Sequence, residues 1–209
     1  MFLGIASGLL LAASSSAAAA AAAATAVAVQ PLPDWHGVAT AGDRARLRGW
    51  REALVKGVAA ATAAGHADSV TREGTLLLPD AALPDAALPA GVYRCRIVKL
   101  GVTATRANGF IAYPPADCVV RAEGAVASLR KTDGAQRPTG LLFADPDSRM
   151  VFLGTMTLGD ERRAVDYGAD PDRDMIGSLQ RIGERRWRLV LPYPRFESIV
   201  DVIELVPAG

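Results

Sequence analysis

The spacing of hydrophobic positions changes along the chain. After Thr40 they recur at intervals of three and four, which is the period of a helix with one buried face. From Gly91 onward they alternate with polar positions, and turn residues such as Asp133-Gly134 interrupt the alternation about every eight to twelve residues. This pattern predicts a helical N-terminal part followed by an antiparallel β-domain.

The helical period is clearest after Thr40. Asp43 follows Thr40 by three positions, a capping-box pattern that predicts a helix N-terminus. The apolar side chains that follow share one stripe: Leu47, Trp50, Leu54, Val58 and Ala61. Gly65 is a suitable residue to end this helix, because glycine readily adopts a positive φ. We expect one amphipathic helix, and then a shorter helix from Ala67 to about Leu77.

Residues 79–90 contain the pentapeptide Pro-Asp-Ala-Ala-Leu twice in tandem, followed by a further Pro-Ala. Prolines at this spacing remove backbone donors and are incompatible with a regular helix. We predict an extended linker that separates the helical part from the β-domain.

The β-domain begins at residue 91. The predicted strands cover residues 92–100, 109–113, 118–123, 125–131, 139–144, 149–158, 175–182, 186–192 and 198–206. Short connections make sequential strands antiparallel. The predicted fold is mainly β with an N-terminal helix, an α+β chain whose eight or nine antiparallel strands form a lipocalin-like or related small β-barrel. A β-sandwich is the alternative.

The N-terminal 30 residues carry no charged side chain, and the first charge in the chain is Asp34. This segment is typical of a signal peptide, residues 1–28, cleaved near Ala26-Val27-Ala28. It is also long enough to cross a bilayer, which needs about 20 apolar residues, so an uncleaved inner-membrane anchor is the alternative. The expected organisation is a signal peptide (1–28), a tether and helices (29–78), a linker (79–90) and a barrel (91–209), located in the periplasm or secreted.

Charge excludes two classes of partner. The 23 Lys and Arg residues against 22 Asp and Glu residues give a net charge of +1. A nearly neutral chain has no electrostatic attraction to nucleic acid or to an anionic membrane surface. We therefore expect no nucleic-acid partner and no membrane association after signal removal.

Cys95 and Cys118 are the two cysteines of the chain. In an exported protein they are expected to form one disulfide, which closes a loop of roughly 24 residues and stabilises the fold by about 3 kcal/mol. Two buried free thiols are the alternative. A tight turn at Asn108-Gly109 and cysteines directly opposite each other cannot coexist in one regular hairpin. Either a break or bulge at Pro114-Pro115 accommodates the difference between the two pairing registers, or the cysteines bridge non-adjacent strands or a strand and a loop.

Several segments of the chain resemble a known family. They are Asp34-Trp35, Tyr93-Arg94-Cys95-Arg96, Lys99-Leu100-Gly101, Gln136-Arg137-Pro138, residues 149–154, Arg181-Ile182-Gly183, residues 186–190 and residues 194–198. Together they resemble an exported bacterial family catalogued as domain of unknown function 4893, over about residues 34–207. The resemblance implies an envelope protein of Gram-negative bacteria. It implies no known activity and assigns no functional residue.

The densest set of polar and aromatic residues is our candidate ligand site: Tyr93, Arg94, Arg96, Arg186, Arg188, Tyr193, Arg195 and Glu197. If these strand faces point into the barrel or its mouth, the guanidinium groups can hold a carboxylate or a phosphate. The alternative is an outer face of arginines that keeps the barrel soluble.

Other chemistry is weakly supported. Asp170, Asp172 and Asp174 match the first half of a calcium loop, but Met175 stands where the loop needs glycine. The pairs Asp34/His36 and His66/Asp68 have the spacing of a base and its orienting carboxylate, but no nucleophile elbow accompanies them. We expect no cofactor and no catalytic residue.

The expected function is a non-catalytic envelope protein that binds a small anionic ligand or another envelope protein. A module similar to periplasmic lysozyme inhibitors is one alternative, because Tyr93-Arg94-Cys95 opens a disulfide-bonded β-domain. An unrecognised hydrolase is the other.

Overall fold

The computed structural model describes residues 34–102, 109–145, 149–195 and 198–209. They lie within one compact unit, Leu32–Gly209. The strands of the described residues are β1 (Gly91–Leu100), β2 (Phe110–Ala112), β3 (Ala116–Glu123), β4 (Val126–Lys131), β5 (Gln136–Asp145), β6 (Arg149–Leu158), β7 (Asp174–Gly183), β8 (Arg186–Pro192) and β9 (Val200–Pro207). The strand regions predicted from the alternation are confirmed.

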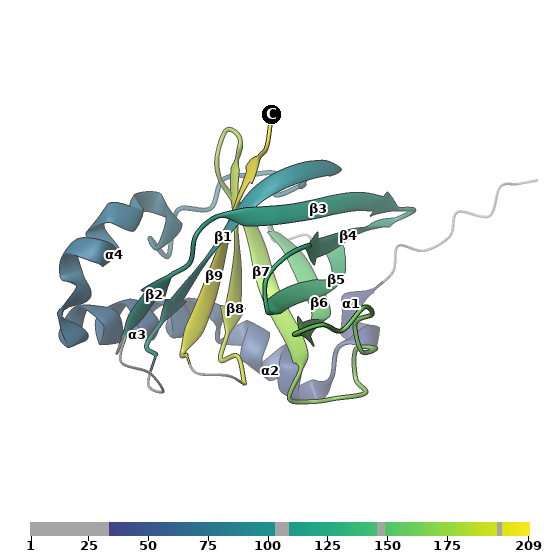
Figure 1. Cartoon of the computed structure of the whole chain (residues 1–209), viewed down its shortest axis with the longest axis horizontal. Coiled ribbons are helices and arrows are strands. Elements are labelled where there is room, and N and C mark those ends of the chain that lie inside the picture. The colour runs from purple at the N-terminus through teal and green to yellow at the C-terminus, as the bar shows by residue number, and fades with distance from the viewer. Residues whose placement is uncertain (1–33, 103–108, 146–148, 196–197) are drawn as a thin grey trace, which may run out of the picture. The chain divides into compact units, whose positions relative to one another are not determined.

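The sheet closes on itself (Figure 1). Every strand from β3 to β9 pairs antiparallel with the next, and β9 pairs antiparallel with β1, from Tyr93 opposite Pro207 to Leu100 opposite Val200. Because β3 also pairs with the first half of β1, the circuit is complete. The predicted barrel is therefore confirmed, and the sandwich alternative is wrong.

Two glycines allow β5 and β6 to lie very close together. Gly140 is paired with Gly154, and a Cβ at Gly154 would lie 2.2 Å from the carbonyl oxygen of Thr139. A side chain at either position is incompatible with this approach, so the glycines permit the tight coiling of the barrel wall.

The barrel interior is filled with side chains. The inward-facing residues form one apolar cluster, in which Leu142, Phe152, Leu179 and Leu189 are fully buried. An eight-stranded barrel is just wide enough for side chains to fill it. In the described part of the chain the centre of the barrel is therefore occupied by side chains.

The cysteine bridge closes β1 onto β3. Cys95 and Cys118 form a disulfide with a Cα–Cα distance of 5.8 Å, which confirms the predicted bond. The two residues are diagonal neighbours rather than directly opposite, because Cys118 faces Tyr93 and Cys95 faces Ala116.

The predicted tight turn is wrong. A two-residue turn there would place Phe110 opposite residue 107, but Phe110 faces Leu100, and Asn108 lies outside the described residues. The register of pairing with β1 does shift at the proline pair, by one residue. Tyr113 donates to the carbonyl of Ile97 and Ala116 faces Cys95, so Pro114 and Pro115 together oppose one residue of β1.

The N-terminal part forms short helices on the outside of the barrel. They are α1 (Trp35–Val38), α2 (Ala41–Arg48), α3 (Trp50–Ala61), a π-turn (Thr62–His66), α4 (Ala67–Glu73) and a 3₁₀ turn (Gly74–Leu76). Helices α2 and α3 pack against strands β7, β8, β9 and β1 (Figure 1). The predicted stripe faces the barrel, because Leu54 and Ala61 are fully buried against Val98 and Val202 in one cluster.

The predicted single helix is interrupted at Gly49, where the amide bonds to the Arg46 carbonyl. The Thr40 cap is formed, since its hydroxyl accepts from the Asp43 amide at 3.1 Å. The Asp43 carboxylate does not complete the capping box. It pairs with Arg46 instead and accepts a hydrogen bond from Tyr167, so this end of α2 is fixed to the barrel rather than to itself.

Residues 84–90, here called the strap, cross the end of the barrel where β1 begins. Leu88 is only 5% exposed and belongs to the interior cluster. The Arg181 guanidinium donates to the carbonyl oxygens of Pro84 and Asp85, and the Tyr93 hydroxyl donates to that of Pro89 at 2.7 Å. The linker is extended, as its prolines require, and its second half closes one end of the barrel.

The two copies of the pentapeptide offer a matched test of the strap. We expect Leu88→Ala to lower the free energy of unfolding by about 2–4 kcal/mol, because it leaves a cavity in the interior cluster. Leu83→Ala, at the same place in the first copy, removes a side chain that is 38% exposed and should cost less than about 1 kcal/mol. Urea unfolding measures both, and equal losses would contradict the role given to the strap.

Candidate functional site

The candidate arginines on β1 and β8 face outward. Arg96 donates to Glu73 at 2.9 Å and to Glu204 at 3.1 Å. Arg186 donates to Glu204 at 2.6 Å and to the hydroxyl of Thr75 at 2.9 Å. Glu73 and Thr75 belong to the helical part, so these two arginines attach it to the barrel wall. The hydrogen bond that Arg96 donates to Glu73 raises the pKa of Arg96 above its usual value.

Arg188 is completely buried between the barrel wall and residues 76–79. Its guanidinium donates to the Gln180 amide oxygen at 2.9 Å and to the backbone carbonyls of Leu76, Leu78 and Pro79. Burial lowers the pKa of Arg188 to about 10, so the group stays charged at neutral pH. These hydrogen bonds attach residues 76–79, which follow the helices, to the barrel wall. The buried Arg188 guanidinium is therefore not accessible to a ligand.

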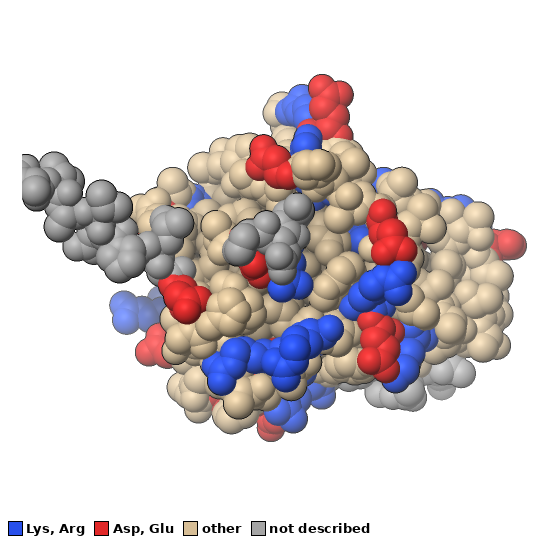
Figure 2. Space-filling model, turned by 180° about the vertical axis from the view of Figure 1, so that it is seen from behind, with Lys and Arg blue, Asp and Glu red and all other residues tan. Residues whose placement is uncertain are grey.

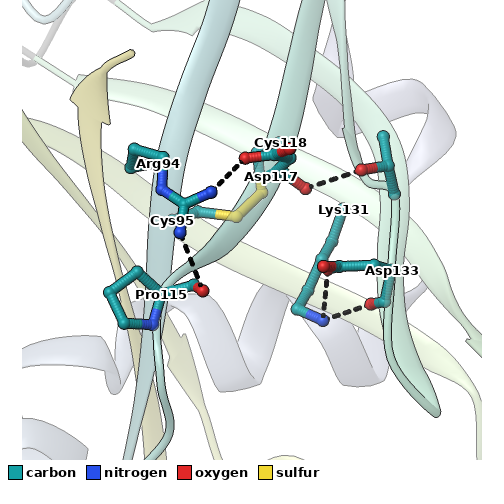
Figure 3. The surroundings of a disulfide bond; sticks show 8 residues. Arg94, Cys95, Pro115, Asp117, Cys118, Lys131 and Asp133 are labelled. Atoms are coloured by element: carbon teal, nitrogen blue, oxygen red, sulfur yellow. Dashed lines mark hydrogen bonds and ion pairs between the residues drawn. A yellow bond between two sulfur atoms is a disulfide. The ribbon is translucent and has the colours of Figure 1, made fainter.

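The remaining candidates are dispersed. Arg94 is half exposed and pairs with Asp117 beside the disulfide (Figure 3). Tyr93 is buried in the barrel interior, and Tyr193, whose φ is +47°, packs against the helical layer. Arg195 is exposed and borders a cavity of only about 20 Å³. Glu197 lies outside the described residues, and the others do not converge on one pocket.

The weak calcium candidate is not assembled. Asp170 pairs with Arg173 at 3.3 Å, and Asp174 is buried, accepting a hydrogen bond from the Gly168 amide at 2.9 Å. Burial raises the pKa of Asp174. Across the ranges that the structure describes, no three His, Cys, Asp or Glu side chains are grouped so that they could hold a metal ion.

The Asp34–His36 pair is formed, with its atoms 2.8 Å apart, but both side chains are more than half exposed. The pair therefore lies in solvent at the start of α1 rather than in a cleft. The Tyr93-Arg94-Cys95 segment does not protrude either, since it is the middle of a paired strand.

A pocket opens at the other end of the barrel from the strap. We call it the mouth. It has a volume of about 410 Å³ and is lined by Ile97 of β1, by Tyr113–Ala116 before β3, and by Lys131 and residues 133–136 between β4 and β5. Ligand pockets typically measure about 300–1,000 Å³. The mouth thus has the size and the mixed apolar and polar walls of a small-molecule site.

Lys131 supplies the positive charge of the mouth. It follows Leu129 on the inner face of β4, is paired with Cys118 in the ladder, and its side chain is 12% exposed. Figure 3 shows its ammonium group directed at Asp133, whose carboxylate lies 3.4 Å away and whose side chain is 62% exposed. The ammonium also donates to the backbone carbonyl of Asp133. It is therefore held at the barrel opening by one backbone hydrogen bond and by one carboxylate contact that water screens strongly.

A second pair of charged side chains, more deeply buried than Lys131, lies on the inner face at this end of the barrel. Lys99 lies opposite Asp201 across the β1–β9 ladder, with Nζ and Oδ2 3.2 Å apart and both side chains almost fully buried. The Ser198 hydroxyl donates to the other Asp201 oxygen at 2.5 Å. The mouth end of the interior therefore contains a buried ion pair within otherwise apolar surroundings.

The mouth residues were missed by sequence reasoning, although a signal exists. Lys131 continues the alternation Ala127, Leu129 on the inner face, and Asp201 precedes Ile203 and Leu205 in the same way. A charged residue at a position that the alternation assigns to the inner face indicates either the opening of the barrel or a buried ion pair.

Comparison with known protein families gives one result. The family model described as domain of unknown function (DUF4893) matches residues 35–205. The chain belongs to this family. No curated protein and no solved structure matches the chain.

Within the described residues of this DUF4893 protein, every helix is too short or too polar to cross a membrane. The buried disulfide is consistent with a location outside the cytoplasm, where such bonds persist. On the face shown in Figure 2, acidic and basic side chains both occur, several of them side by side.

Arg188 and Arg94 give a test of which arginines are structural. Arg188→Met should lower the free energy of unfolding by about 3–5 kcal/mol, because it leaves buried carbonyl groups without a donor. Arg94→Gln breaks an exposed pair and should cost less than about 1 kcal/mol. Urea unfolding measures both effects, and hydrogen exchange should report faster exchange at residues 76–81 in the Arg188 variant. A neutral Arg188→Met substitution would contradict this assignment.

Proposed function

We propose that this protein is an exported, non-catalytic binding protein whose ligand is a small molecule with an apolar body and one anionic group. The observation that carries the proposal is the inward-facing Lys131 ammonium in an otherwise largely apolar mouth. The ligand body lies against Ile97, Pro114 and Ala116, and its anionic group reaches Lys131.

The contact between Lys131 and the Asp133 carboxylate is the one that the ligand replaces, while the hydrogen bond from Lys131 to the Asp133 backbone carbonyl stays in place. At 3.4 Å, with the carboxylate largely exposed, the replaced contact contributes little to stability. A ligand carboxylate held between apolar walls is less screened, so it binds the ammonium more strongly than Asp133 does. Asp133 then turns toward water, where its charge is solvated.

A filled barrel interior favours a small ligand. Because the inner cluster leaves no room beyond the level of Ile97, the ligand occupies the rim and does not enter the barrel. Ligands of this kind are short-chain or aromatic monocarboxylates rather than long lipids.

Binding of a panel of monocarboxylates, from hexanoate to 4-fluorobenzoate, tests the site by NMR titration of the 15N-labelled protein. We expect the acids to shift the amide resonances of residues 131–136 and the corresponding neutral amides to bind at least about tenfold more weakly. Lys131→Met should weaken acid binding by about tenfold, and Lys131→Arg should retain it. Lys56→Met, which changes an exposed surface pair, is the control.

Two results would contradict the proposal: acids and amides binding equally, or none of the acids binding at millimolar concentration. Normal binding by the Lys131→Met variant would exclude Lys131 as the anion partner.

Export is proposed from the uncharged leader and supported by the disulfide. Protein purified from its native host should have a mass that lacks residues 1–28, and reduction should add the mass of two hydrogen atoms. Intact mass spectrometry before and after reduction measures both. A full-length mass would indicate an uncleaved anchor, and a mass unchanged by reduction would contradict the disulfide.

A further inference from the structure

A second pocket lies at the strap end of the barrel. It has a volume of about 560 Å³ and is lined by strap residues, by the aromatic rings of Tyr93 and Trp187, by Pro207 and by the charged side chains Arg181, Glu184 and Arg185. Tyr93 and Trp187 meet edge to face, with ring centroids 6.1 Å apart. The pocket therefore has an aromatic floor and a charged rim.

Trp187 carries an unsatisfied donor in this floor. Its side chain is 5% exposed, and its indole Nε1 is the one buried side-chain polar atom without a hydrogen-bond partner in the described parts of the chain. Such a group costs about 1–3 kcal/mol, and buried donors in native proteins normally have an acceptor. The neighbouring Tyr93 hydroxyl donates to Pro89 of the strap and is not a hydrogen-bond partner of this indole nitrogen.

The rim adds donors that the protein does not use fully. Arg185 is exposed and donates only from Nη2, to the carbonyl of Gly209 at 3.0 Å, so among the described residues its Nε and Nη1 have no partner. Glu184 and Asp85 offset the charges of Arg181 and Arg185. A nearly neutral rim with free guanidinium donors favours a monoanion over a phosphate or another polyanion.

We propose that this pocket is a second binding site, for an aromatic monoanion whose oxygen accepts the Trp187 indole N–H and whose charge is met by Arg185. The aromatic body lies on Tyr93 and Trp187, where ring contacts are favourable. Because Nε1 is buried, the ligand reaches it by shifting the strap residues that border the pocket, Ala87, Pro89 and Ala90. This site is independent of the mouth and of Lys131.

The probe for the test is 1-anilinonaphthalene-8-sulfonate, which combines an aromatic body with one sulfonate. In the 15N-labelled folded protein, titration should move the Trp187 indole N–H proton resonance downfield, as expected for a new hydrogen bond, and leave those of Trp35 and Trp50 in place. The resonance is assigned by its loss in Trp187→Phe. Probe fluorescence should rise in the same titration.

Variants separate the contributions. Trp187→Phe keeps the aromatic floor and removes the donor, so it should weaken probe binding about tenfold. Arg185→Gln changes an exposed residue that does not affect folding and should weaken binding about fivefold. Lys131→Met, at the mouth, should leave probe binding unchanged. An unmoved Trp187 resonance, no binding, or equal binding by Arg185→Gln would overturn the proposal without affecting the one made for the mouth.

Discussion

The pairing of β9 with β1 is the constraint on which the rest of the structure depends. Eight residue pairs, from Tyr93–Pro207 to Leu100–Val200, join the last strand to the first and leave the barrel without a gap in its wall. Closure assigns each side chain of these strands to an inner or an outer face. Inner positions must be apolar or paired, which explains both the filled interior and the buried Lys99–Asp201 pair.

Closure also gives the barrel two different ends. At the strap end, Leu88 and the three hydrogen-bonded carbonyl groups of Pro84, Asp85 and Pro89 cover an apolar interior. At the mouth, nothing comparable to the strap lies over Lys131 and Ile97 in the described residues, and the interior holds the buried Lys99–Asp201 pair. The two proposed sites follow from this difference: an anion site at an open rim, and a donor-lined pocket under a displaceable segment.

Outward-facing arginines act together with the apolar cluster between the helices and the barrel wall. Arg96, Arg186 and Arg188 bond to side chains and carbonyls of residues 73–79 and so hold the helical part against the wall. The sequence showed that these residues are dense and share strand faces. It did not show whether that face points into or out of the barrel. Helices cover the outside of β8 and β9, so both faces of these strands are buried and the alternation of polarity is lost there.

The sequence by itself determined the local structure: the strand regions, the Thr40 cap, the extended linker and the identity of the bonded cysteines, since these depend on side-chain period, backbone propensity and compartment chemistry. Tertiary structure decided the rest. The same pentapeptide places Leu83 at the surface and Leu88 in the barrel interior, and Asp80 pairs with Arg51 whereas Asp85 adopts a φ of +58°. Identical local preferences gave different outcomes because burial depends on which distant residues arrive at each position.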